Sequence, residues 1–349
     1  MQKKVIVGIS GGVDSSVAAV LLKEQGYEVI GVTFVFTDDF DTSDAIKVCN
    51  KIGIEHHVVE YKDMFKKNVI NKFISDYNKG ITPNPCILCN REVKFNFLYQ
   101  KMLELNCDFI ATGHYAKVVD GRLFKSEDLN KDQTYFLAQL TNEQLKHLIL
   151  PLEGINKDVV REVARKYELV TADKKDSTDV CFINSKFKEF IADKVDNKIG
   201  DVIDVATNKI VGKHNGLRGY TIGQRKGLNI GGSKDRMYVV GKNIEKNILY
   251  VAFGDDSDYL VSTSCVLSSI NLINSDIPRN VEAKFRYRQN LIDVEIECVS
   301  DNEIIVNYPT GVKAVTPGQA CVFYKGDECL GGGIIKEVRK NNQKMWYLL

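Results

Sequence analysis

The sequence predicts an α/β protein with an amino-terminal doubly wound parallel sheet, a small β-rich central domain and a carboxy-terminal β-barrel. Two observations support this prediction. Strand-like and helix-like segments alternate over the first half of the 349 residues, as they do in parallel sheets with helices on both faces. From residue 196 onward, short alternating segments follow one another without a helical period. We therefore expect domains at 1–195, 196–255 and 256–349.

The first domain is expected to open with a strand at 5–9 and a helix at 15–25. Further strands are expected at 29–36, 56–59 and 109–113, and further helices at 43–52, near 65–77, and at 91–105, 143–148 and 157–167. Gly26 and Gly53 suit helix C-caps, and Asp120-Gly121 suits the turn of a hairpin at 118–124. Ligands bind such sheets at the carboxyl ends of the strands, here near Ser10, Phe34 and Gly113.

The second half contains short segments with strand patterning, separated by Gly, Asn and Asp. They lie at 202–203, 237–241, 248–253, 281–287, 293–299, 304–306, 320–324 and 333–338. We expect residues 196–255 to form a small linking domain and residues 256–349 to close into a barrel.

The composition is ordinary for a soluble globular chain, with 44% hydrophobic and 27% charged residues. We expect no signal peptide and no membrane span, because the first residues run directly into a strand and no apolar stretch is long enough. The expected location is cytoplasmic, where thiols stay reduced, so the nine cysteines indicate packing or chemistry rather than a disulfide scaffold. A net charge of +1 implies that local patches would hold any nucleic acid.

The stretch 8–16 reads Gly-Ile-Ser-Gly-Gly-Val-Asp-Ser-Ser, between an apolar run and a helical pattern. A strand that turns through glycines into a helix aims backbone N–H groups and a positive helix end at one point, which suits pyrophosphate. Serine hydroxyls add donors, and Asp14 can hold a magnesium ion or accept from an N–H of the turn. The stretch fits neither the Walker loop nor the dinucleotide fingerprint. It resembles the signature of the PP-loop ATP pyrophosphatases, which adenylate a substrate and release pyrophosphate.

A second informative stretch, 82–91, reads Thr-Pro-Asn-Pro-Cys-Ile-Leu-Cys-Asn-Arg. Its two prolines restrict the backbone that leads to the cysteines. We expect Cys89 at the start of the helix that contains Arg91 and Lys94. A helix amino end and nearby cations would lower the pKa of that thiol and prepare it as a nucleophile. Cys181 lies in another polar stretch with cationic neighbours.

Three interpretations of Cys86, Cys89 and Cys181 stay open. They are buried structural thiols, or they hold an iron–sulfur cluster whose fourth iron faces the substrate, or two of them form a redox or sulfur-relay pair. A zinc ribbon would need a second Cys-x-x-Cys, which the sequence lacks. We expect the remaining cysteines to be buried in the core: Cys49, Cys107, Cys265, Cys298, Cys321 and Cys329.

Basic residues gather in two places. Arg286, Tyr287 and Arg288 interleave cations with an aromatic ring, which suits RNA backbone and bases. The second patch is the stretch 213–242, which has one acidic residue, Asp235, and seven basic ones: Lys213, Arg218, Arg225, Lys226, Lys234, Arg236 and Lys242. The alternative for both patches is a solvated loop surface.

Taken together, a series of strings along essentially the whole chain resembles the bacterial tRNA-specific 2-thiouridylases. The strings are the stretch 8–16, Thr82-Pro-Asn-Pro with Cys89-Asn, Ala111-Thr-Gly-His-Tyr115, Asn130-Lys-Asp-Gln-Thr-Tyr-Phe136, Lys175-Asp-Ser-Thr with Cys181-Phe-Ile, Thr221-Ile-Gly-Gln-Arg-Lys-Gly-Leu228, Phe285-Arg-Tyr-Arg-Gln289, Val315-Thr-Pro-Gly-Gln319 and Cys329-Leu-Gly-Gly-Gly333. The fold that the resemblance implies for the first domain is the adenine nucleotide alpha-hydrolase-like PP-loop fold.

The resemblance also implies roles for particular residues. Cys89 would be the nucleophile, and Cys181 would carry a persulfide. ATP would be bound by Gly8, Ile9, Ser10, Gly11, Gly12, Val13, Asp14 and Ser15, with Phe34 and Gly113 lining the adenosine pocket. The target uridine would lie near Asn84, Pro85 and Cys86, and the tRNA would contact Lys131, Asp132, Gln133, Arg286 and Tyr287. At position 86 the family often has Asp. Cys86 cannot act as a carboxylate base, and it completes a set of three thiols.

The implied reaction is ATP- and Mg²⁺-dependent 2-thiolation of the wobble uridine (U34) of tRNA, which yields 2-thiouridine, AMP and pyrophosphate. Adenylation turns the uracil oxygen into a good leaving group. An upstream sulfur donor (a cysteine desulfurase or a sulfur-relay protein) would load Cys181, and a reductant would reopen a Cys89–Cys181 disulfide. The alternative within the family is sulfide delivered from a [4Fe–4S] cluster on Cys86, Cys89 and Cys181. Rivals outside it are a PP-loop amidotransferase or synthetase for a small molecule, and a non-catalytic RNA-binding protein.

Overall fold

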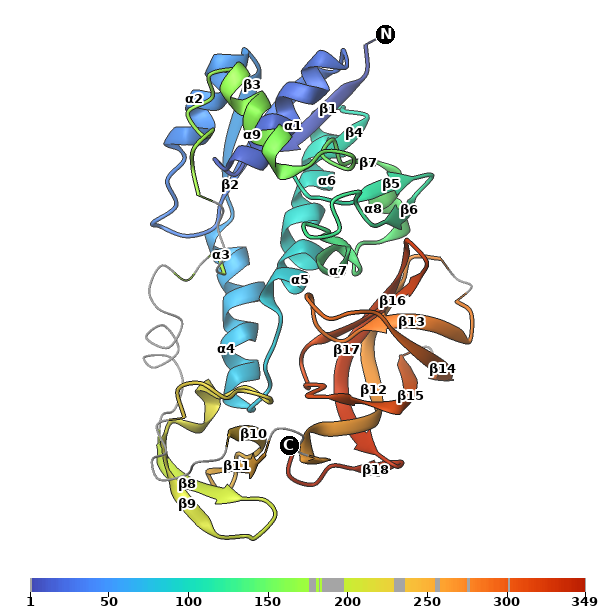
Figure 1. Cartoon of the computed structure of the whole chain (residues 1–349). Coiled ribbons are helices and arrows are strands. Elements are labelled where there is room, and N and C mark those ends of the chain that lie inside the picture. The colour runs from blue at the N-terminus through green and yellow to red at the C-terminus, as the bar shows by residue number, and fades with distance from the viewer. Residues whose placement is uncertain are drawn as a thin grey trace.

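The computed structural model describes residues 2–175, 180–181, 183, 198–228, 236–254, 258–274, 277–300 and 302–348. These residues form a parallel sheet domain, a small central sheet and a closed barrel (Figure 1). This is the predicted architecture. The predicted boundaries, 195/196 and 255/256, fall on residues outside the described ones. No helix among the described residues is long and apolar enough to cross a membrane.

The first domain is built on a five-stranded parallel sheet in the order β3-β2-β1-β4-β7. The strands are β1 (Lys4–Gly8), β2 (Glu28–Val35), β3 (Glu55–Glu60), β4 (Phe109–Ala111) and β7 (Leu148–Ile149). Neighbouring side chains of a strand point to opposite faces. Val5 and Val7 therefore pack with one set of helices, α1 (Val13–Glu24), α2 (Ser43–Ile52) and α9 (Lys157–Lys166), whereas Ile6 packs on the other face with α6 (Phe95–Glu104). The doubly wound prediction is confirmed.

Two long helical runs extend from this sheet. The first consists of α3 (Lys62–Phe65), η1 (Lys66–Ile70) and α4 (Asn71–Asn78), and α4 reaches down to the central domain (Figure 1). The second consists of α5 (Pro85–Cys89), η2 (Asn90–Lys94) and α6. The expected helix start at residue 91 is therefore wrong. The helix begins at Pro85, because the Asn84 side chain accepts from the backbone N–H of Ile87 at 3.4 Å and caps the first turn.

The predicted hairpin is present as β5 (Lys117–Val119) and β6 (Arg122–Phe124). Its turn residues Asp120 and Gly121 both have positive φ, 51° and 73°, as a two-residue hairpin turn requires. Short helices α7 (Thr134–Leu137) and α8 (Asn142–Lys146) follow. The sequence did not indicate that β6 pairs with the barrel strand β17 (Glu328–Lys340), which joins the first domain to the last.

The central sheet has the order β10-β11-β8-β9. Its elements are β8 (Ile199–Asp204), β9 (Ile210–Asn215), η3 (Leu217–Gly219), β10 (Met237–Asn243) and β11 (Ile248–Phe253). One hydrophobic core includes buried residues of this sheet, such as Val239, and of the barrel, such as Phe323. The two β domains therefore pack as one unit.

The barrel closes through six strands, because β12 pairs with both β15 and β17. The elements are η4 (Asp258–Leu260), β12 (Val261–Leu272), β13 (Asn280–Lys284), β14 (Ile292–Ser300), β15 (Glu303–Lys313), β16 (Ala320–Lys325), β17 and β18 (Gln343–Lys344). Cys298 is exposed on β14, so the expectation that it is buried is wrong.

Candidate active site

The glycine turn between β1 and α1 is held in place by its own serines. The backbone N–H of Ser10 donates to Oγ of Ser15 at 3.1 Å, and the Ser15 and Ser16 hydroxyls donate to the carbonyl of Gly12 at 3.1 and 2.8 Å. Gly11 has φ +73°, a conformation that glycine adopts without strain. The turn therefore points the amino end of α1 at one place, which suits an oxyanion.

Gly113 lies directly against this turn. A Cβ atom at Gly113 would lie 2.6 Å from the carbonyl carbon of Asp14 and 2.6 Å from the backbone nitrogen of Ser15. Only glycine fits at that separation. The carboxyl end of β4 is thus packed closely onto the start of α1; contact of Gly113 with adenosine, which the family resemblance implies, stays a prediction.

Two cations from outside the turn reach into it. Nζ of Lys157, at the start of α9, lies 2.6 Å from Oδ1 of Asp14, and the hydroxyl of Tyr115 donates to the same oxygen at 2.8 Å. Nζ of Lys174 donates to the carbonyl of Gly11 at 2.9 Å and lies 2.7 Å from Asp44 Oδ2. The sequence interpretation missed both lysines as site residues. Lys174 lies in the polar stretch before Cys181, and nothing in the sequence singles out Lys157.

Phe34 is buried in a cluster of aromatic rings. Its ring centroid lies 5.5 Å from that of Tyr61, 6.0 Å from that of Phe36 and 6.2 Å from that of Phe97. This cluster packs the carboxyl end of β2 against α6. Contact of Phe34 with adenosine stays a prediction.

The two thiols of the capped helix differ in exposure. Cys86, in the first turn, is exposed, whereas Cys89 is 7% exposed. Burial raises the pKa of the Cys89 thiol to about 12, and the nearby charge of Lys94 opposes this rise only in part. The expectation of a lowered pKa is therefore wrong: Cys89 lies one turn inside the helix rather than at its amino end, and burial disfavours the thiolate.

Cys181 lies near enough to these two thiols to influence their charge states, although it is far away in sequence. Burial raises the pKa of all three thiols; a thiolate at Cys181 adds to the rise for Cys86 and Cys89, and the ammonium of Lys94 opposes the rise in each case. The groups are thus close enough for their charges to interact. Cys181 is exposed, and the nine cysteines are free thiols.

Lys94 also connects the thiols to the glycine turn. Its charge, after burial, lowers the pKa of His114 well below the usual value. His114 follows Gly113, whose backbone contacts Asp14 and Ser15. A short path of neighbours therefore leads from Cys89 through Lys94 and His114 to the oxyanion site. The sequence interpretation treated Lys94 only as a neighbouring cation.

An iron–sulfur cluster on the three thiols receives no support from their placement. Within the described residues, which include all three, no group of three or more His, Cys, Asp or Glu side chains is arranged to hold a metal ion. No reaction step below depends on such a cluster.

Several of the residues expected to contact tRNA form hydrogen bonds within the protein instead. Asp132 is buried and accepts from the Thr134 hydroxyl at 2.8 Å, and Gln133 accepts from the backbone N–H of Tyr115 at 2.9 Å. Nη2 of Arg286 donates to the carbonyl groups of Ile222 and Ala314 at 3.0 and 2.6 Å. These bonds give Asp132 and Arg286 structural roles, because their polar atoms face the protein interior. A role in tRNA contact receives no support from their placement.

Tyr287, a further residue of that set, lies where the barrel contacts the first domain. The Tyr287 ring lies 4.5 Å from that of Phe136, and Lys131 is half-buried. Of the residues expected at the target base, Asn84 is half-buried, Pro85 is buried and Cys86 is exposed. Contact of these residues with the target base stays a prediction.

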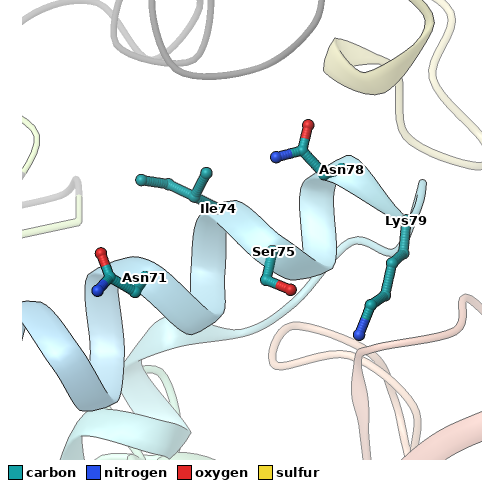
Figure 2. A pocket seen from close by; sticks show the side chains of 5 residues that line it. All are labelled: Asn71, Ile74, Ser75, Asn78 and Lys79. Carbon is teal, nitrogen blue, oxygen red and sulfur yellow. The ribbon is translucent and has the colours of Figure 1, made fainter.

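A groove of about 430 Å³ runs along α4, the last helix of the first helical run. Figure 2 shows its side chains along the helix, with Lys79 reaching away from the C-terminal end. The lining residues are Asn71, Ile74, Ser75, Asn78 and Lys79. Amides, a hydroxyl and an ammonium are groups that bind phosphate and sugar oxygens.

Comparison with known proteins gives matches along the chain. Family models match with the descriptions "tRNA methyl transferase HUP domain" over residues 3–185, "tRNA methyl transferase PRC-barrel domain" over residues 188–253, and "Aminomethyltransferase beta-barrel domain" over residues 262–335. A tRNA-specific 2-thiouridylase MnmA of Mycoplasmopsis synoviae is 44% identical over 370 aligned positions, covering 99% of each chain. The protein of the same name from Bacillus subtilis is 45% identical over 364 positions, covering 99% of this chain and 98% of the relative.

Among solved structures, a 4-thiouridine synthetase in complex with RNA and bound ATP matches with a TM-score of 0.37 and 20% identity. The match covers 51% of this chain and 44% of that one. A likeness of this size carries no argument, so the comparison depends on the full-length relatives.

Proposed function

Because the chain belongs to the family of tRNA-specific 2-thiouridylases, we propose that it exchanges the 2-oxygen of the wobble uridine of tRNA for sulfur and consumes ATP. The observation that supports this proposal is that Cys89, Cys181 and Lys94 lie close enough for their charges to interact, and that Lys94 also influences His114, the neighbour of Gly113 at the glycine turn. Neither a small-molecule synthetase nor a non-catalytic RNA-binding protein would need two thiols from distant segments beside a pyrophosphate site.

The first step activates the base. The uracil 2-oxygen attacks the α-phosphorus of ATP, the bond to the β-phosphate oxygen breaks, and pyrophosphate leaves. Backbone N–H groups at the amino end of α1 bind the departing anion, and Lys174 and Lys157 lie close enough to add positive charge. A magnesium ion fits here, because one carboxylate together with substrate phosphates is a common ligand set for it, and Asp14 supplies that carboxylate. When bound, the ion neutralises phosphate charge.

The second step delivers sulfur. The terminal sulfur of a persulfide on Cys181 attacks C2, and AMP departs with the former 2-oxygen. The Cys89 thiolate then attacks the inner sulfur of Cys181 and breaks the persulfide S–S bond. Sulfur stays on the uridine, and a Cys89–Cys181 disulfide forms. A dithiol reductant restores both thiols. The proximity of the two thiols supports this sequence of bond changes.

The burial of Cys89 adds a condition to this step. With a pKa of about 12, the resting residue is almost entirely a thiol at neutral pH. A protonated thiol is neither nucleophilic nor readily oxidised. Deprotonation must accompany substrate binding, and Lys94 is the cation that stabilises the thiolate.

Two further partners follow from the chemistry. Cys181 is exposed, which supports loading by a sulfur donor from outside, namely a cysteine desulfurase or a sulfur-relay protein. The groove on α4, with its amide, hydroxyl and ammonium groups, supports an approach of tRNA from that side.

The proposal is tested by nucleoside analysis of unmodified tRNA treated with the protein, ATP, Mg²⁺ and a persulfide source. We expect 2-thiouridine at position 34, with one AMP and one pyrophosphate formed per sulfur. The same digest also detects methylated nucleosides, which are worth measuring because two of the matching family models are described as tRNA methyl transferase domains. Methylation without thiolation, or AMP release that depends on a small acid and not on tRNA, would refute the proposal.

A further inference from the structure

The segment 78–82, here called the junction segment, links the C-terminal end of α4 to the capped turn that carries Cys86 and Cys89. Two cations of the central domain bind its carbonyl groups. Nε of Arg218 donates to the carbonyl of Asn78 at 2.9 Å, and Nζ of Lys242 donates to that of Gly80 at 3.0 Å. Carbonyl groups at a helix C-terminus attract positive charge, so these contacts dock the central domain onto α4.

The barrel holds the same segment from its other end. The backbone N–H of Thr82 donates to the carbonyl of Pro317 at 3.2 Å, and Nε2 of Gln319 donates to the carbonyl of Thr82 at 2.7 Å. Between them, Gly318 lies so close that a Cβ atom there would be 2.2 Å from the side chain of Ile81. Both β domains therefore fix the backbone that leads into the thiol-bearing turn.

Lys242 reaches this segment because of an irregularity in β10. The pairing of β10 with β11 shifts register between Val239 and Gly241, which places one extra residue in β10. An extra residue reverses the alternation of side chains beyond it. Lys242 then shares the face of Met237 and Val239, both of which are buried. The backbone of Tyr347 packs directly against Gly241 of this strand, so closely that a Cβ atom at Gly241 would overlap the carbonyl of Tyr347.

A buried lysine at this position lowers the stability of the fold. Its side chain is 2% exposed, and no carboxylate among the described residues is paired with it, so the buried ammonium is destabilising. Burial lowers the pKa of Lys242 to about 7. A methionine would fill the same volume without this cost. What the lysine provides that a methionine cannot is the hydrogen bond to the Gly80 carbonyl.

We propose that Lys242 and Gln319 are positioning residues of the thiolation reaction, which hold the junction segment so that Cys89 keeps a fixed place relative to RNA bound by the β domains. The inference rests on the proposed function and deepens it. Neither residue touches the reacting atoms; each acts through the backbone between Gly80 and Thr82.

The test compares Lys242→Met and Gln319→Leu with wild type in single-turnover thiolation at saturating tRNA, together with tRNA affinity and thermal unfolding. We expect each variant to form 2-thiouridine at least tenfold more slowly, while the Kd for tRNA changes less than twofold and the Tm does not fall. Lys242→Arg, which keeps a cationic donor, recovers part of the rate. Lys246→Met, an exposed lysine on the same strand connection, is the matched control and keeps the wild-type rate.

A merely structural role would lower Tm and rate together, and a binding role would disappear at saturating tRNA. Folded variants that react within twofold of wild type, or losses that saturating tRNA restores, would overturn the inference. If Lys242→Met fails to fold, Gln319→Leu decides, since it alters the barrel side of the same segment. A wild-type protein that makes no 2-thiouridine would instead count against the proposed function.

Discussion

The ammonium nitrogen of Lys157 lies 2.6 Å from Oδ1 of Asp14, at the start of α1. The Tyr115 hydroxyl donates to the same oxygen at 2.8 Å. Two segments far from the glycine turn thus fix the direction of its one carboxylate. Because Lys157 lies at the first position of α9, the packing of α9 on α1 is coupled to the geometry of the oxyanion site.

Replacement of Lys157 by methionine should impair activation of the base. A hydrogen bond to a charged group contributes about 1.5–3 kcal/mol, so its loss should slow tRNA-dependent AMP formation about 10- to 150-fold. Lys166→Met provides the control, since this lysine lies on the same helix but is exposed. Equal rates of AMP formation in the two variants would show that the contact between Lys157 and Asp14 does not contribute to activation of the base.

Replacement of Gly113 by alanine should disturb the glycine turn from the opposite side. The new methyl group would lie 2.6 Å from backbone atoms of Asp14 and Ser15, and backbone gives way less readily than a side chain. Overpacking of this kind costs about 1–3 kcal/mol. We expect weaker ATP binding, measured by calorimetry, in a protein that still folds. Gly219→Ala, where an added Cβ meets nothing within 4 Å, should bind ATP normally; a matching affinity for Gly113→Ala would be inconsistent with this packing.

The raised pKa of Cys89 predicts how its alkylation depends on pH. A thiol reacts as the thiolate, and with a pKa of about 12 the thiolate fraction rises about tenfold for each pH unit below that value. Iodoacetamide pulses followed by peptide mapping should show a Cys89 rate that climbs without levelling between pH 7.5 and 10. The exposed Cys86 and Cys181 should label first. Lys94→Met should slow Cys89 further, because Lys94 lowers its pKa. A plateau below pH 9 would contradict the assignment.

Serine at either Cys89 or Cys181 should abolish 2-thiouridine formation and leave ATP binding unchanged, because each thiol forms a bond that a hydroxyl cannot replace. Thiolation that persists in either variant would refute the role of that residue. Cys86→Asp should be measured alongside these variants. It should still form 2-thiouridine if position 86 only shapes the pocket. Iron in anaerobically purified wild-type protein that is lost in Cys86→Asp would favour the cluster alternative instead.

The sequence predicted much of the first domain because its signals are local. Gly53 ends α2 with φ 64°, and Asp120-Gly121 forms its hairpin turn, both as expected. The helix start at Pro85 was misplaced although Asn84 and Pro85 are typical of an N-cap and first position. The two prolines suggested a stiff loop more strongly than a helix start, and this error carried over to the expected pKa of Cys89.

Other features could not be predicted, because they depend on tertiary contacts. Regular alternation along β10 would place Lys242 with Tyr238 on the less buried face, and only the register shift beside Gly241 turns it inward. Lys157 approaches Asp14 through the packing of α9 on α1. The meeting of Cys89 and Cys181 was expected from the family resemblance and not from any spacing in the chain.

The burial of Lys242 predicts a dependence of stability on pH. Its pKa is about 7 in the folded protein and 10.5 for the ordinary side chain, so between these values the unfolded chain binds more protons than the folded one. Stability of the wild type therefore rises with pH through this window. Methionine at this position removes the effect.

Between pH 7 and 9, we expect the wild type to gain stability relative to Lys242→Met, by at most about 1.36 kcal/mol per pH unit. Below pH 7 the difference between the two proteins should become constant, because Lys242 is then protonated in both the folded and the unfolded wild-type chain. Urea denaturation at several pH values measures the midpoints, and the exposed control Lys246→Met should follow the wild type throughout. A difference that does not vary with pH would mean that Lys242 keeps an ordinary pKa in the fold, and its burial against Gly80 would then have no consequence for protonation.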